Sequence, residues 1–93
     1  MASPWRRRPL CLLAAGGQAP AALDHVSGRG AFLETDARPV LGTVVTLRHP
    51  EAGAIEGRVI GVQSNGVALR FRPGPDSVTW AMAAIAADMS RPA

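Results

Sequence analysis

Apolar and polar residues alternate along several short segments of the chain, which is the pattern of half-buried β-strands. The clearest case is segment 67–71, where Val67, Leu69 and Phe71 point to one face and the residues between them to the other. Read in this way, with turn residues separating the segments, the sequence predicts six strands. They cover residues 10–15, 21–26, 31–35, 43–48, 55–63 and 67–71.

Segment 55–63 departs from simple alternation. Ile55 and Val59 share one face of an extended strand, whereas Ile60 and Val62 share the other. A β-bulge near one of the two glycines of this segment, Gly57 or Gly61, would reconcile the two phases. Next along the chain, an Asn-Gly pair at residues 65–66 stands between two apolar runs, which predicts a two-residue type I′ hairpin.

After a Pro-Gly-Pro stop at residues 73–75 the apolar period becomes that of a helix, with Asp76 as its predicted N-cap. Four apolar residues share one helix face at spacings of four, three and four: Val78, Met82, Ile85 and Met89. Trp80 lies off this face and is expected to pack on the rim of the β-structure or on a partner. Short strands followed by one helix predict a mainly β fold, a small antiparallel barrel or sandwich.

Composition limits the size and charge of the domain. The chain has 93 residues and a formal net charge of +3, and we expect one domain at residues 10–90 behind a flexible, arginine-rich arm at residues 1–9. All ten basic residues are arginine, whose planar fork suits phosphate oxygens and the guanine edge. An all-arginine set is also what a GC-rich genome produces, so composition alone does not assign a ligand.

Signatures of enzymes and metal sites are sparse. Cys11 is the single cysteine, so no internal disulfide or cysteine-based metal site is expected, and a reducing cytoplasm fits best. His25 and His49 have no cluster of ligands at metal-binding spacing, and both are expected at the surface. Asp24 and His25 are strand neighbours that should point to opposite faces, which argues against a catalytic triad with Ser27. We therefore expect no enzyme activity and no cofactor.

The N-terminal segment 6–21 has some features of a short signal peptide. Its apolar part is only about six residues long, below the length of a secretory core, and Gly16 and Gly17 interrupt it. No stretch approaches the ~20 apolar residues that span a bilayer. These observations predict a cytoplasmic protein.

A Ser-x-x-Gly turn and the arginine run are the features that suggest binding. Ser27 and Gly30 frame a tight turn ahead of strand 31–35, and Gly28 and Gly30 are expected to supply positive φ there. The run upstream consists of three arginines, Arg6, Arg7 and Arg8. The run has three interpretations: a solvated tail, a clamp on a phosphate or nucleotide, or a nonspecific nucleic-acid contact. The last is disfavoured because no aromatic residues alternate with the arginines to stack on bases.

The order of these features along the chain resembles the PilZ domain family over about residues 6 to 90. The features are the arginine arm, the Ser-x-x-Gly turn, the strand after it, the Asn-Gly hairpin and the closing strand. The resemblance implies a six-stranded antiparallel barrel with a C-terminal helix. It also implies a noncatalytic bacterial receptor for cyclic di-GMP, in which an Arg-x-x-x-Arg arm and an Asp/Asn-x-Ser-x-x-Gly turn hold the nucleotide.

Carried over by position, Ser27 and Gly30 match the turn, while His25 occupies the Asp/Asn slot with Asp24 beside it. No Arg-x-x-x-Arg occurs, so the run 6–8 matches at most one arginine of the pair. The resemblance implies ligand-binding roles for these residues. Losing two such contacts would cost about 2–5 kcal/mol, which changes a roughly micromolar site to a nearly millimolar one. Arg29, Arg6 or a register slip that brings Asp24 to the ligand would restore part of this. The alternative is a degenerate PilZ domain that binds an unknown protein partner through the helix from Val78 to Met89 or through Trp80.

Overall fold

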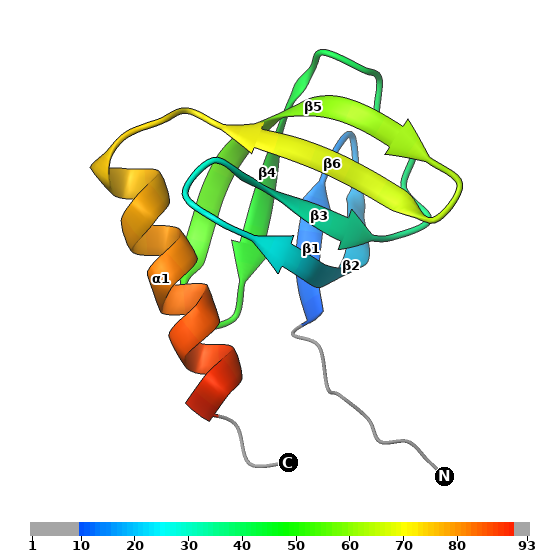
Figure 1. Ribbon diagram of the computed structural model, residues 1–93. Coiled ribbons are helices and arrows are strands. Elements are labelled where there is room, and N and C mark those ends of the chain that lie inside the picture. Colours follow the sequence, from blue (N-terminus) through cyan, green and yellow to red (C-terminus); the bar gives the residue numbers. More distant parts are fainter. Residues whose placement is uncertain (1–9, 91–93) are drawn as a thin grey trace, which may run out of the picture.

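The computed structural model describes residues 10–90, which form a closed β-barrel and one helix (Figure 1). The elements are β1 Leu10–Ala14, β2 Gln18–Val26, β3 Gly30–Glu34, β4 Val44–His49, β5 Gly53–Gln63, β6 Gly66–Phe71 and α1 Pro75–Ser90. Around the barrel the strands follow the order β1-β2-β3-β6-β5-β4, and neighbouring strands are antiparallel. The predicted mainly β fold, a six-stranded barrel with a C-terminal helix, is confirmed. The predicted arm, residues 1–9, lies outside the described residues.

The interior of the barrel is filled by aliphatic side chains and one phenylalanine from alternate strand positions. The largest fully buried side chains of the strands are Leu13, Leu33, Leu47, Val59, Val67, Leu69 and Phe71. The alternation predicted for β6 is therefore confirmed, because its three apolar residues are all at most 2% exposed. Cys11 of β1 joins this core, and burial raises the pKa of its thiol to about 11, so the thiol is neutral at physiological pH.

The predicted bulge in β5 is present. The register with β6 shifts between Val59 and Gly61, close to one of the two expected glycines. Ile60 lies in the shift and is 49% exposed, whereas Val62 packs against the core. The expectation that Ile60 and Val62 share a face is therefore wrong, because the extra residue reverses the phase between them.

The hairpin between β5 and β6 is one residue away from its predicted position. Gln63 pairs with Gly66, so the two turn residues are Ser64 and Asn65 rather than the Asn-Gly pair. Gly66 is already part of β6, and a Cβ atom there would collide with the carbonyl oxygen of Leu33 on β3. This glycine serves close strand packing and not the turn.

Arg38 fastens the loop between β3 and β4 to the rest of the barrel. Its guanidinium donates hydrogen bonds to the carbonyl oxygens of Thr35 and Ala37, at 3.1 and 2.8 Å, and to that of Ser64 at 2.8 Å. Arg38 therefore has a structural role. It lies in a loop separate from the Ser-x-x-Gly turn.

The helix begins at Pro75, one residue before the predicted N-cap. Proline suits the first helical position because its missing N–H would have no partner there. The carbonyl oxygen of Gly74 accepts from the backbone N–H of Val78 at 3.3 Å and from the hydroxyl of Ser77 at 3.1 Å. Asp76 is thus in the first turn rather than at the cap, where its carboxylate still favours the positive end of the helix dipole.

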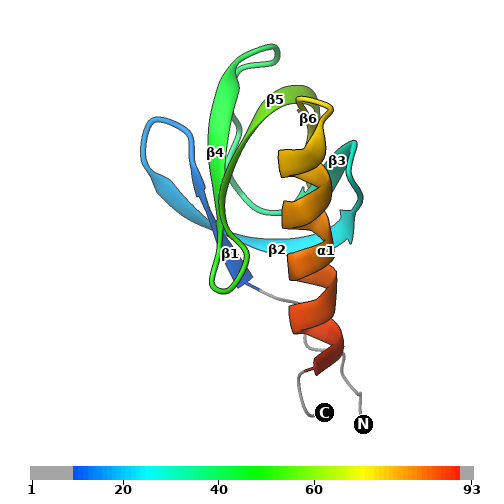
Figure 2. The same ribbon diagram turned by 90° about the vertical axis from the view of Figure 1, so that its left-hand side faces the viewer.

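Trp80 attaches α1 to one end of the barrel. Its side chain is 4% exposed, and its ring meets Phe71 and His49 edge-on, with centroids 5.5 and 5.9 Å apart. Its indole N–H donates to the carbonyl oxygen of Gly53 at 2.9 Å. Of the two contacts expected for this residue, the structure has the one with the barrel rim. Figure 2 shows α1 running alongside the barrel from the end of β6.

His49 is buried, at 3% exposure, so the expectation of a surface position is wrong. The imidazole covers the edge of Trp80, and its Nδ1 accepts the backbone N–H groups of Glu51 and Ala52, each at 3.0 Å. The sequence pattern did not show this because the burial comes from Trp80 of the helix, 31 residues further along the chain, which packs over the β4–β5 turn.

Candidate functional site

The Ser-x-x-Gly turn is held by hydrogen bonds that leave its hydroxyl facing solvent. The backbone N–H of Ser27 donates to the carbonyl oxygen of Gly30 at 2.9 Å, and the N–H of Arg29 donates to the Ser27 hydroxyl oxygen at 3.1 Å. The N–H of Phe71 on β6 donates to the carbonyl oxygen of Arg29 at 2.8 Å. Because the hydroxyl oxygen accepts within the turn, its hydrogen can be donated outward to an anionic oxygen.

The two glycines of this turn are required for close packing and not for positive φ, contrary to expectation. A Cβ atom on Gly30 would collide with the carbonyl oxygen of Leu69 on β6. A Cβ atom on Gly28 would lie 3.0 Å from a methyl group of Val78 on α1. The turn is therefore pressed between β6 and the start of the helix, which fixes its position on the barrel.

A second bulge places two polar side chains together just before the turn. The register between β2 and β3 shifts between Leu23 and His25, and Asp24 is the extra residue. His25 and Asp24 are both exposed, with the imidazole Nδ1 3.5 Å from the carboxylate. The expectation that these neighbours point to opposite faces is wrong, because the bulge breaks the alternation. The bulge places the Asp24 carboxylate, whose side chain is 31% exposed, beside His25 in the Asp/Asn slot.

The arginine run lies outside the described residues, and only its point of attachment is visible. Leu10, the first residue of β1, pairs with Ala22, and β2 continues from there to Val26 and the turn. The chain therefore enters the barrel at the end where the Ser-x-x-Gly turn lies.

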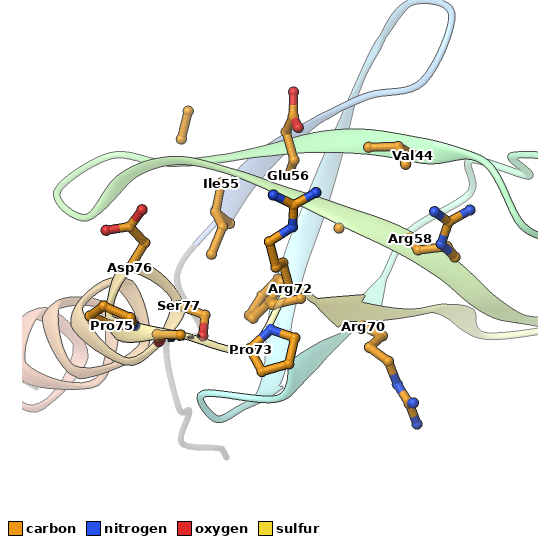
Figure 3. A pocket seen from close by; sticks show the side chains of 14 residues that line it. Val44, Ile55, Glu56, Arg58, Arg70, Arg72, Pro73, Pro75, Asp76 and Ser77 are labelled. Carbon is orange, nitrogen blue, oxygen red and sulfur yellow. Dashed lines mark hydrogen bonds between the residues drawn. The ribbon is translucent and has the colours of Figure 1, made fainter.

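A basic cleft that the sequence did not reveal lies on the outer face of β5 and β6 (Figure 3). It has a volume of about 690 Å³. Arg58 and Arg70 come from the two strands and Arg72 directly follows β6, while Asp76 and Ser77 come from the start of α1. Alternation did place Arg70 and Arg72 outward. That Arg58 stands directly opposite Arg70 follows only from the strand register, which alternation does not fix.

Residues 10–90 contain no group of three or more His, Cys, Asp or Glu side chains arranged to hold a metal ion. The helix in this part of the chain is neither long nor apolar enough to cross a membrane.

Comparison with known proteins identifies the family. The family model of the PilZ domain matches residues 5–85, which is most of the chain and includes both the arginine run and the Ser-x-x-Gly turn. No curated protein and no solved structure matches. A match of this length, on a closed six-stranded barrel with a C-terminal helix, shows that the chain belongs to the PilZ domain family.

Proposed function

We propose that this protein is a noncatalytic receptor for cyclic di-GMP that acts in the cytoplasm and binds the nucleotide between its N-terminal arginines and the Ser-x-x-Gly turn. PilZ domains are in general modules of the cyclic di-GMP-binding type. The observation that carries the proposal is the turn itself: Ser27 is exposed, its hydroxyl hydrogen can be donated outward, and the chain enters β1 at the same end of the barrel.

The chemistry around the turn suits a guanine nucleotide. The Ser27 hydroxyl can donate to a phosphate oxygen, and the exposed Asp24 carboxylate can accept from the N–H groups of a guanine base. His25, beside that carboxylate, offers a further donor and a flat ring. Arg6, Arg7 and Arg8 would supply guanidinium groups for phosphate and for the guanine O6/N7 edge. Bound nucleotide would hold the arm against the barrel and so change the surface presented to a partner.

Isothermal titration with cyclic di-GMP tests the proposal. We expect wild-type protein to bind with a micromolar to millimolar Kd, and Ser27→Ala and Arg8→Ala each to weaken binding about tenfold, the effect of losing about 1.4 kcal/mol. Ser64→Ala is the matched control, because Ser64 also lies in an exposed two-strand turn but at the other end of β6. Absence of heat at millimolar nucleotide in low salt would contradict the receptor function.

A second candidate function rests on the outer face of α1. Four apolar side chains there are 41–79% exposed: Val78, Met82, Ile85 and Met89. Their spacing of four, three and four residues is that of a coiled-coil seam, so a partner that presents an apolar helix would fit this face. As a degenerate PilZ domain, the protein would then act as an interaction module without nucleotide.

A sedimentation experiment tests whether the partner of this face is a second copy of the protein. If α1 pairs with the helix of a second copy, wild-type protein should show a concentration-dependent dimer that Met82→Glu abolishes and Thr79→Glu leaves in place. Thr79 is exposed on the same helix but outside the apolar face. A strictly monomeric protein at high concentration would exclude self-pairing through this face.

A further inference from the structure

One row of residues crosses the outer surface of the barrel beside the turn. Ser27 is hydrogen-bonded to Gly30, Gly30 pairs with Arg70 on β6, and Arg70 pairs with Arg58 on β5. Neighbouring strands are about 4.8 Å apart. The backbone of Arg70 is therefore one strand away from the Ser-x-x-Gly turn, and the backbone of Arg58 is two strands away. Gly30 has no side chain to separate the turn from Arg70.

The pairing of Arg58 with Arg70 works against stability, because like charges directly opposite on adjacent strands repel each other. Both residues are exposed on the outer face. Within the described part of the chain, no hydrogen bond or ion pair engages the guanidinium of Arg70. Arg58 donates one bond, 2.7 Å long, to the carbonyl oxygen of Gly42, which holds the arginine in place and leaves further N–H donors of its fork.

The next outward-facing positions along β5 and β6 carry opposite charges and not two arginines. Phe71 pairs with Gly57, so Arg72, the residue after β6, comes opposite the acidic Glu56, although no ion pair joins these two described residues. The unbalanced positive charge of this surface therefore comes from Arg58 and Arg70, which both line the cleft (Figure 3).

We propose that Arg58 and Arg70 form an anion clamp on the barrel that binds a phosphate of the ligand held by Ser27. The inference rests on the proposed function and specifies it further: the guanidinium that an Arg-x-x-x-Arg arm would contribute is supplied by β5 and β6. In Figure 3 the two guanidinium groups point away from each other, Arg58 being bonded to the Gly42 carbonyl, so both exposed side chains rotate toward the anion on binding. Attraction to the ligand then outweighs the repulsion between the two forks. The clamp takes a phosphodiester or pyrophosphate-like group, and Arg29 lies at the turn itself to contact the same charge.

The test is an amide chemical-shift titration with two probes, cyclic di-GMP and inorganic pyrophosphate. Arg70→Ala should weaken binding of both probes at least tenfold, and Arg58→Ala should do the same. Arg70→Lys keeps the charge but not the fork and should lie between Arg70→Ala and wild type. Arg48→Ala is the control: Arg48 is an exposed arginine on β4, and its pairs are Leu12 and Ala54 rather than another arginine.

Each outcome decides one point. If Arg70→Ala loses binding of both probes while its melting temperature is unchanged or higher, the clamp is supported. Equal binding of the nucleotide by wild type and Arg70→Ala overturns the clamp but leaves the receptor function intact. Pyrophosphate binding that depends on Arg70, without nucleotide binding, supports the anion site and overturns the receptor function. No response of wild-type protein to either probe overturns both.

Discussion

Trp80→Ala is expected to lower the free energy of unfolding by about 3–5 kcal/mol, the usual cost of removing a large buried aromatic side chain. Trp80 is 4% exposed, and its ring covers Phe71 at the end of the barrel. The substitution also removes the indole donor from the Gly53 carbonyl. Small domains are stable by only about 5–15 kcal/mol, so this one contact supplies a large part of the free energy of unfolding. It also determines whether α1 stays on the barrel.

Thermal and urea unfolding followed by circular dichroism measure this effect. A loss of this size corresponds to a fall in Tm of at least about 12 °C for a domain of this length. Met82→Ala, on the exposed face of the same helix, should change stability by no more than about 0.5 kcal/mol. Trp80→Phe keeps an aromatic ring without the N–H donor and should fall between the two. Equal stability of Trp80→Ala and Met82→Ala would show that the helix does not pack on the barrel through Trp80.

Gly30→Ala is expected to cost about 2–3 kcal/mol, at the upper end of overpacking effects, although alanine is the smallest possible addition. The reason is the rigid neighbour: the new Cβ would collide with the backbone carbonyl of Leu69, so one strand must move. That movement would also separate Gly30 from Arg70 and tilt the turn that carries Ser27. We therefore expect stability and nucleotide affinity to fall together.

Urea unfolding of Gly30→Ala beside Gly17→Ala measures this effect. A Cβ atom on Gly17 meets nothing within 4 Å, and Gly17 does not have positive φ, so alanine there should be neutral or slightly stabilising. If Gly30→Ala were as stable as Gly17→Ala, the close approach of the turn to β6 would be wrong. The same result would contradict the short distance from the turn to Arg70, on which the anion clamp depends.

The existence and type of each element could be predicted from the sequence because each depends on local periodicity. Alternation placed the buried residues of β6, and the helix appeared where the period changed. What alternation cannot give is register. The bulge at Asp24, the turn at Ser64 and the pairing of Arg58 with Arg70 all depend on which residue of one strand faces which residue of the next.

The helix illustrates a second limit of sequence patterns. Its largest apolar residues define the stripe that periodicity detects, and that stripe is exposed. The face against the barrel instead combines Trp80 with small residues that allow close approach, Ala81 and Ala84, which are 3% and 0% exposed. Size, not hydrophobicity alone, selects the packed face, because a curved barrel end admits one large ring only when its neighbours are small.

The candidate site could be predicted in part for the same reason. Ser27 and Gly30 were recognised because they are close in sequence, and His25 and Asp24 because they precede the turn. Arg58 and Arg70 are twelve residues apart and meet only through the β5–β6 hairpin, so no local motif contains both. The roles of Arg6, Arg7 and Arg8, which lie outside the described residues, stay predictions.

The most direct test of the central proposal is to map where cyclic di-GMP binds on the isotopically labelled full chain by amide chemical shifts. We expect the largest shifts in residues 24–30 together with Arg58 and Arg70, because the turn and the two arginines form one continuous row on the barrel. Residues of the β1–β2 turn, 15–17, at the other end of the barrel, should not shift. Saturating nucleotide that leaves residues 24–30 unshifted would contradict the proposal.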